Sequence, residues 1–174
     1  AHTSDLHLGK RLSNYDMTED QRYILDGILD VIVREEVDAL LIAGDIYDKS
    51  IPSEDAVGLF SYLLTRLNEI GCPVYIAAGN HDSGRRMDFC SDILGSSDIH
   101  ITGSFRGSTD AFTLEEDGLR VDIHLLPFIR PYAVRVVCGE DVSGLDQAVS
   151  VVLDRSDIDP DAVNILVAHQ FVKD

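Results

Sequence analysis

The sequence lacks the features of a membrane-spanning or secreted protein. It contains no run of about 18 apolar residues, so we expect no transmembrane helix. No basic stretch followed by an apolar one stands at the N-terminus, so we expect no signal peptide on this chain. The three cysteines, Cys72, Cys90 and Cys138, are odd in number and form no Cys-x-x-Cys pair, which argues against a disulfide framework and a zinc ribbon. A cytoplasmic protein without a membrane partner is the simplest interpretation.

Positive charge is also scarce. The chain has 14 Lys and Arg against 31 Asp and Glu, which gives a net charge of −17 at pH 7. Because Lys and Arg supply most of the affinity for nucleic acid, this balance argues against a general nucleic-acid binder. Solvated acidic surface explains most of the charge, and a carboxylate-rich metal site is compatible with it. If the substrate is nucleic acid, we expect other domains or partners to supply much of the positive field.

The apolar pattern predicts a single α/β domain. The length of 174 residues suits one domain, and the chain has no internal repeats or linkers. Short apolar runs typical of buried strands alternate with amphipathic stretches, and Thr18 with Gln21 forms a candidate capping box. We expect strands at 1–4, 38–43, 73–78, 111–116, 120–126 and 163–168, and helices at 18–36, 53–70, 85–94 and 145–155.

Polar side chains that can bind a metal follow four of the expected strands. In open α/β sheets ligands bind outside the carboxyl ends of strands, so these loops can converge although they are distant in sequence. Carboxylate, imidazole and amide oxygen without thiolate suit a divalent ion such as Mn²⁺, Mg²⁺, Fe²⁺ or Zn²⁺. The side chains are Asp5 and His7 after the first strand, Asp45 and Asp48 after the second, Asn80 and His81 after the third, and His169 after the last.

This arrangement predicts a two-metal site. Asp45 can bridge two ions with its two oxygens, and Asp5 and His7, alternating on extended backbone, would reach one of them. Asn80 and His169 would hold the other ion. Two ions about 3.5–4 Å apart can orient and deprotonate a bridging water while clamping a phosphoryl oxygen. The neighbouring His81 is placed to donate a proton to the leaving oxygen.

Each of these residues also has an ordinary explanation when it is taken alone. Asp5 could cap a helix beside a surface His7, the Gly44-Asp45 and Gly79-Asn80 pairs could be turns, and His169 could be a core histidine. Their joint occurrence at strand ends, in this order, argues against so many coincidences.

The order Asp-x-His, Gly-Asp-x-x-Asp, Gly-Asn-His-Asp and a later His resembles the calcineurin-like metallophosphoesterase superfamily over nearly the whole chain. Residues 2–10, 79–83, 127–131 and 168–172 further resemble the SbcD-type nuclease subunits, which are related to the Mre-type nucleases. The resemblance implies a four-layer α/β/β/α sandwich of mixed sheets flanked by helices. It also implies a manganese-dependent DNA exonuclease and endonuclease for recombination and repair, paired with an SbcC-like SMC-type ATPase.

The resemblance assigns roles to individual residues. The first metal takes Asp5, His7 and Asp45, and the second takes Asp45, Asn80 and His169. His81 matches the catalytic histidine, and Asp48 matches a position beside the site that could orient His81. The family also dimerises through helices that correspond to residues near 53–70 and 84–94.

One departure concerns the end of the site. The family completes it with a Gly-His-x-His motif some tens of residues beyond His169, whereas this chain stops at Asp174. We therefore interpret residues 1–174 as a truncated nuclease domain, without the C-terminal part of that domain and without the capping domain. We expect this fragment alone to bind metal weakly and to cleave poorly.

Five of the few basic residues closely follow the first three of the four loops with metal-binding side chains. A coincidence on a solvated surface is the plain alternative to a role in binding. Our hypothesis is that they contact DNA phosphates on either side of the scissile one. They are Lys10, Arg11, Lys49, Arg85 and Arg86.

Two other functions stay open. The same metal chemistry could serve a metallophosphoesterase that acts on a small phosphodiester or a phosphoprotein, which the net acidity mildly favours. A non-catalytic domain of the same fold that only binds a partner is the second alternative.

Overall fold

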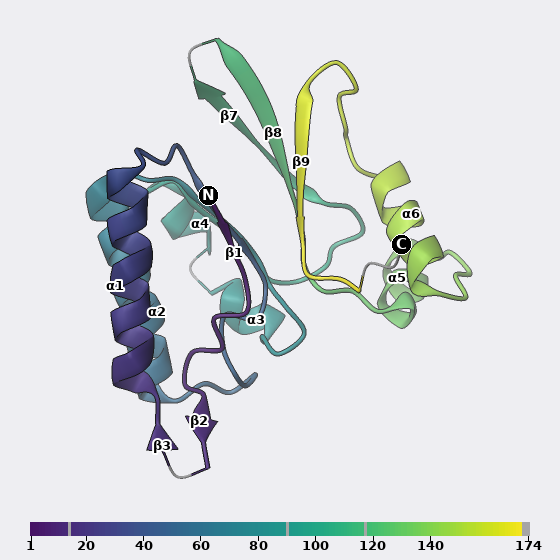
Figure 1. Ribbon diagram of the computed structural model, residues 1–174. Coiled ribbons are helices and arrows are strands. Elements are labelled where there is room, and N and C mark those ends of the chain that lie inside the picture. Colours follow the sequence, from purple (N-terminus) through teal and green to yellow (C-terminus); the bar gives the residue numbers. More distant parts are fainter. Residues whose placement is uncertain (14, 90, 117, 172–174) are drawn as a thin grey trace.

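A parallel sheet forms the half of the molecule that contains the N-terminus (Figure 1). The computed structural model describes residues 1–13, 15–89, 91–116 and 118–171. Within them the strand order is β1-β4-β5-β6, and each neighbouring pair is parallel. Parallel strands end at the same edge of a sheet, so the loops that follow them share one end of the molecule. The strands are β1 (His2–Thr3), β4 (Leu40–Ala43), β5 (Val74–Ala77) and β6 (Ile99–Thr102).

Two long helices, α1 (Thr18–Arg34) and α2 (Glu54–Ile70), cover one face of this sheet (Figure 1). The boundaries of α2 follow from its sequence. The Ser53 hydroxyl accepts a hydrogen bond from the backbone N–H of Ala56, and Gly71 ends the helix with a φ of 78°. Its buried leucines, such as Leu63 and Leu67, pack with those of α1 and the sheet into the largest apolar cluster.

A second sheet packs on the other face of the first. Its strands are β7 (Asp110–Glu116), β8 (Leu119–Leu126) and β9 (Val163–Ala168). The β7–β8 pair is antiparallel and the β8–β9 pair is parallel, so the sheet is mixed. Tyr75 and Ala77 from β5 meet Ile123, Leu125 and Val167 between the two sheets.

Two helices close the opposite side of the molecule (Figure 1). Helices α5 (Pro131–Cys138) and α6 (Leu145–Asp154) pack over one end of the second sheet, where Leu126 and Ile129 lie in a third apolar cluster. Parallel and antiparallel sheets flanked by helices confirm the predicted fold class. No helix within the described residues is long and apolar enough to cross a membrane.

Several local predictions are wrong or incomplete. The predicted helix at 85–94 is instead two short helices, α3 (Gly84–Met87) and α4 (Ser91–Gly95). The Asp88 carboxylate, at the end of α3, accepts hydrogen bonds from the backbone N–H groups of Gly103 and Ser104, a tertiary contact that helical periodicity does not predict. The sequence pattern also missed β6, α5 and a small hairpin, β2 (Arg11–Leu12) with β3 (Tyr15–Asp16).

The predicted capping box at the start of α1 is also wrong. The Thr18 hydroxyl donates to the Asp16 carboxylate, and Met17 stands at the N-cap without a side-chain cap. Gln21 lies in the first turn of α1, but its side chain contacts the loop that follows β1, where its amide donates to the carbonyls of Leu6 and His7.

Candidate metal centre

The loops after β1 and β4 run side by side at the carboxyl edge of the parallel sheet. The backbone N–H of Asp5 donates to the carbonyl of Gly44 at 3.1 Å, and that of His7 donates to the carbonyl of Asp45 at 3.0 Å. These bonds continue the β1–β4 pairing beyond the strands, so Asp5, His7 and Asp45 are held next to one another.

The backbone at these three residues is not extended, which corrects the predicted reason for their convergence. Asp5, His7 and Asp45 have φ values of 56°, 43° and 51°, in the left-handed region that side chains with a Cβ rarely adopt. Such conformations cost free energy and persist only where surrounding contacts hold them, and they are found mainly at functional sites. Asp5 and His7 thus lie together because the chain turns, with 3.7 Å between Oδ1 of Asp5 and Nε2 of His7.

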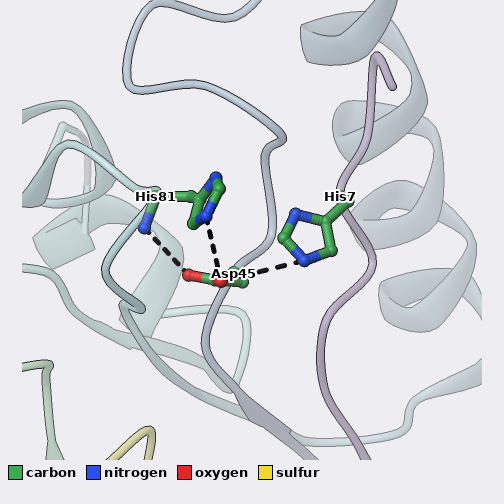
Figure 2. Close-up of side chains that lie close together, drawn as sticks. All are labelled: His7, Asp45 and His81. Atoms are coloured by element: carbon green, nitrogen blue, oxygen red, sulfur yellow. Dashed lines mark hydrogen bonds and ion pairs between the residues drawn. The ribbon is translucent and has the colours of Figure 1, made fainter. Parts of the chain in front are cut away.

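Asp45 occupies the middle of the cluster. Its residue surface is only 3% exposed, and its Oδ1 accepts a hydrogen bond from the backbone N–H of His81 at 2.9 Å. Its Oδ2 lies 3.8 Å from Nε2 of His7, 4.0 Å from Nε2 of His81 and 3.4 Å from Nε2 of His169. Figure 2 shows the rings of His7 and His81 approaching this carboxylate from two sides. One carboxylate oxygen therefore faces three imidazole nitrogens.

Backbone carbonyls fix the tautomers of two of these histidines. A carbonyl can only accept, so Nδ1 of His169 donates to Ala43 and Nδ1 of His81 donates to Asp48, each at 2.8 Å. In the neutral rings Nε2 is then the atom with the free lone pair, and it is this atom that faces Asp45. Asp48 thus reaches His81 through its backbone. Its side chain lies against His7 instead, with Oδ1 3.8 Å from Nδ1.

The contact with Asp48 also shifts the ionisation of His81. The hydrogen bond to the Asp48 carbonyl raises the pKa of His81 above its usual value, and partial burial opposes this. The nearby carboxylates of Asp45, Asp48 and Asp82 raise the pKa further. In the metal-free protein, His81 therefore holds its proton to a higher pH than a free histidine does.

The donor atoms form two groups that share Asp45. His7, Asp45 and His81 make one group, and Asp5, Asp45 and His169 make the other. Within each group the candidate ligand atoms lie within 4.8 Å of one another. The mixture of carboxylate oxygen and imidazole nitrogen fits a divalent cation. Nδ1 of His7, on the side of the ring that faces Asp48, is buried and has no hydrogen-bond partner among the described residues.

Asn80, the remaining predicted ligand, lines a cavity of about 290 Å³ together with Asp5 and His169. The structure thus brings all the predicted metal-binding and catalytic residues to one end of the molecule. It differs from the prediction in the grouping, since His81 lies as close to Asp45 as the predicted ligand His7 does, within 0.2 Å.

Two glycines allow this close approach. A Cβ on Gly44 would collide with the ring of His169, and one on Gly79 would collide with the carboxylate of Asp45. Gly44 also has a φ of 78°. Gly44 and Gly79, which the sequence shows only as turn signals, are therefore requirements of packing.

Two glutamines belong to the site and were missed as such. Gln21 holds the His7 loop on both sides, because its side-chain oxygen also accepts from the N–H of Gly9 at 2.9 Å. Gln170 lines the cavity with Asn80, and its buried Oε1 has no hydrogen-bond partner within the described residues. The position of Gln170 directly after His169 could have indicated that it belongs to the site. Nothing in the sequence indicates that Gln21 contacts His7, 14 residues earlier in the chain.

Four of the five predicted basic residues line two different cavities. Arg11 and Lys49 line a cavity of about 250 Å³ beside Asp48, and Arg11 pairs with Asp16 at 2.9 Å. Arg85 and Arg86 instead line an apolar groove of about 660 Å³ between α2 and β6. In the part of the chain that the structure describes, Lys10, Lys49, Arg85 and Arg86 have no carboxylate within 4.0 Å.

The fold and this carboxylate–imidazole cluster are those of a metallophosphoesterase-type domain. The calcineurin-like phosphoesterase family matches residues 1–171, and the chain belongs to that family. This is a family of phosphoesterases that use divalent metals, and the candidate ligand groups of this chain fit such an ion.

A curated relative narrows the comparison. The chain is 33% identical, over 172 residues, to a protein of Staphylococcus epidermidis that is named as the SbcD subunit of the nuclease SbcCD. The match covers 97% of this chain and 45% of the relative, so the chain spans a little under half of the relative's length. The resemblance to SbcD-type subunits that the motifs indicated is thereby confirmed.

Proposed function

We propose that this chain is the metal-binding part of a DNA nuclease, the nuclease subunit of an SbcCD-like repair complex. The observation that carries the proposal is the buried Asp45 carboxylate, whose Oδ2 faces His7, His81 and His169 within 4.0 Å. Similarity to an SbcD protein supports DNA as the substrate and an SbcC-like ATPase as the partner. In this proposal the longer protein adds the Gly-His-x-His ligands and the capping domain that the family resemblance implies.

The proposed ligand sets are those that the family resemblance implies, and the contacts support part of them. Asp5, His7 and Asp45 would hold one divalent ion, and Asp45, Asn80 and His169 would hold the other, with Mn²⁺ the preferred metal. Bound at this place, the ions supply polarisation of a phosphoryl oxygen and acidification of a water. His81 donates a proton to the leaving oxygen, and the Asp48 carbonyl holds its Nδ1 so that Nε2 faces the site. The Asp48 side chain supports His7.

Substrate choice tests the proposal. Full-length protein with Mn²⁺ is offered single- and double-stranded DNA, a cyclic nucleotide and p-nitrophenyl phosphate. We expect hydrolysis of DNA to exceed that of the small substrates. Hydrolysis of only the small esters would support a small-phosphodiester or phosphoprotein enzyme, and binding of metal without turnover of any substrate would support a non-catalytic domain. The net charge of −17 is the observation in favour of a small substrate.

We further propose that cations near the site contact DNA phosphates. Lys10 and Lys49 are exposed, follow the two metal loops that contain His7 and Asp48, and have no carboxylate partner within the described chain. The double variant Lys10→Ala/Lys49→Ala should bind DNA more weakly and reduce the slope of log affinity against log salt by about 2. Arg34→Ala is the control, because Arg34 pairs with Glu35 at the far end of α1. An equal slope in both variants contradicts the role.

Arg85 and Arg86 need their own test because they line the apolar groove and not the cavities beside the metal centre. If these arginines contact DNA, the variant Arg85→Ala/Arg86→Ala should bind DNA with a weaker dependence on salt. If these arginines serve only the groove, the salt slope stays unchanged.

The same groove supports the proposal of a homodimer. Buried Phe60, Leu64 and Met87 line the groove, and so do the exposed side chains of Val57 and Phe89. An exposed apolar surface of this kind marks an interaction site. Light scattering at micromolar concentration should show a dimer, and Phe89→Asp should dissociate it. Tyr23→Asp on α1 is the control, because Tyr23 is as exposed as Phe89, at 77%.

A cytoplasmic location is part of the same proposal. Within the described residues Cys72 and Cys138 are free thiols, as expected in a reducing compartment. Cys90 lies outside the described residues.

A further inference from the structure

Asp82 binds the backbone of both loops that surround Asp45. Its Oδ2 accepts hydrogen bonds from the N–H groups of Gly79 at 2.8 Å and Ile46 at 3.2 Å. Its Oδ1 accepts from the N–H of Tyr47 at 2.9 Å. One carboxylate therefore satisfies three backbone donors, one from the loop after β5 and two from the loop after β4. The sequence motif Gly79-Asn80-His81-Asp82 contains this residue, but none of the roles proposed for the metal centre uses it.

The two loops are joined in both directions. The Asp82 side chain, in the loop after β5, accepts a hydrogen bond from the backbone of the loop after β4. The Asp45 side chain, in the loop after β4, accepts one at 2.9 Å from the N–H of His81 in the loop after β5. Between them Gly79 packs so tightly on Asp45 that a Cβ would collide with its carboxylate. The position of the Asp45 carboxylate thus depends on how these loops are held together.

Two of the backbone N–H groups that Asp82 binds belong to the residues directly after Asp45, whose backbone is strained. Asp45 has a φ of 51°, and Ile46 and Tyr47 are the next two residues of the chain. A left-handed conformation at a residue with a Cβ persists only when its surroundings fix it. Two hydrogen bonds to the adjacent peptide groups do this, and their charge-assisted character makes them stronger than neutral bonds.

We propose that Asp82 is a positioning residue that fixes Asp45 for metal binding. This inference rests on the proposed function, because it takes Asp45 as the shared metal ligand. Only a carboxylate fits the place. Asparagine offers one acceptor oxygen, and its amide group would turn a donor toward at least one of the three N–H groups. The loop after β4 would then relax, and Oδ2 of Asp45 would move away from His7 and His169.

Asp88 provides a matched control. Its carboxylate also accepts two backbone N–H groups from another segment, Gly103 at 2.9 Å and Ser104 at 3.3 Å, but it takes no part in the metal loops. Asp88→Asn therefore removes a comparable side-chain-to-backbone link elsewhere. A general loss of stability should affect both variants, whereas a loss of positioning should affect only Asp82→Asn.

The experiment measures Mn²⁺ binding by calorimetry in the full-length protein and its two variants, together with melting temperature and amide hydrogen exchange without metal. We expect Asp82→Asn to weaken Mn²⁺ binding by about 10- to 100-fold, as loss of a residue that orients a ligand does. The amides of Tyr47 and Gly79 should exchange faster in that variant. Asp88→Asn should lower the melting temperature and leave Mn²⁺ affinity unchanged.

The outcomes separate this inference from the proposed function. If wild-type protein binds no Mn²⁺, the metal centre itself is wrong. If wild type binds Mn²⁺ and both variants bind it equally well, or lose affinity by the same factor, the positioning role of Asp82 is wrong. Should Asp82→Asn fail to fold, Asp82→Glu replaces it in the same comparison, because its longer side chain cannot place both oxygens without displacing a loop.

Discussion

Asp45 and Asp122 are both buried aspartates, but their surroundings differ in kind. They are 3% and 6% exposed. Asp122 lies in β8, where its carboxylate accepts hydrogen bonds from the Thr113 hydroxyl at 2.7 Å and from two nitrogens of Arg120 at 2.8 and 3.1 Å. Asp45 has no Arg or Lys within 4.0 Å in the described chain, and its Oδ2 faces imidazole nitrogens at 3.4 to 4.0 Å.

The difference shows what each carboxylate is for. The charge of Asp122 is satisfied inside the chain, so its role is structural. The charge of Asp45 has no Arg or Lys partner within the described chain, and Asp5 adds a second carboxylate to its ligand group, which favours binding of a cation. A buried carboxylate that faces several histidines and no Arg or Lys, held on strained backbone, is therefore a better sign of a metal site than burial or acidity alone.

The largest expected effect comes from removing the charge of Asp45. Asp45→Asn should weaken Mn²⁺ binding by more than about 100-fold, because a shared ligand is expected to matter more than the residues that orient it. Calorimetry on the full-length protein measures this loss. Asp122→Asn is the matched control and should keep wild-type affinity. If the two variants bind Mn²⁺ alike, the contrast between the two aspartates has no functional meaning.

His81 should matter for the proton and not for the metal. His81→Asn should slow DNA hydrolysis by about 10²- to 10⁴-fold, the usual contribution of a general acid. The loss should be much smaller for a p-nitrophenyl phosphodiester, whose leaving group needs no proton. Steady-state rates on both substrates give this comparison.

The control for His81 is His124, which lies near Asp122. Its Nε2 donates to Asn164 and its Nδ1 faces the Thr109 hydroxyl at 3.2 Å, so it is a satisfied structural histidine. His124→Asn should lower stability without changing the leaving-group dependence. Equal rate losses on both substrates in His81→Asn, with weaker Mn²⁺ binding, would show that His81 is a ligand and not an acid.

The pH dependence of stability should show that the ionised Asp122 carboxylate stabilises the fold. Hydrogen bonds from Thr113 and Arg120 lower the pKa of Asp122 below its usual value. A carboxyl group with a lowered folded-state pKa stabilises the protein above its unfolded-state pKa, and this contribution disappears as the pH falls through the folded-state pKa. The melting temperature of metal-free protein should therefore fall less steeply below about pH 4 in Asp122→Asn than in wild type. Identical slopes would contradict the assignment.

The smallest effect should come from Thr113→Val, which removes one of the hydrogen bonds to Asp122 and keeps its pairing with Arg120. The pKa of Asp122 should rise toward its usual value, so the acid unfolding midpoint should move up slightly, by less than in Asp122→Asn. Acid titration followed by circular dichroism measures the midpoint. Mn²⁺ affinity should be unaffected, and a change in it would link the two regions that we regard as independent.

The sequence could predict where the metal loops meet because that depends on strand order and periodicity. Apolar runs at 38–43 and 73–78 end just before Asp45 and Asn80, and the parallel strands β4 and β5 present these ends at one edge of the first sheet. The apolar run at 163–168 ends just before His169, but it forms β9 of the second sheet and is mostly exposed. The boundaries of α2 were also predictable, since Ser53 and Gly71 act through local hydrogen bonds and local φ.

Features that depend on tertiary contacts could not be predicted. The left-handed backbone of Asp5 and His7 is imposed by pairing with the loop after β4, and local sequence gives no sign of it. Gln21 fits a capping box by spacing, yet the nearby carbonyls of Leu6 and His7 bind its amide. Residues 85–94 have helical periodicity, but Asp88 binds the loop after β6 and the helix is interrupted.

The most direct test of the metal centre is the anomalous scattering of Mn²⁺ in crystals of the full-length protein. We predict two peaks on either side of the Asp45 carboxylate, one next to Asp5 and His7 and the other next to Asn80 and His169. Crystals grown with saturating Mn²⁺ that show no peak within coordination distance of Asp45 would contradict the account.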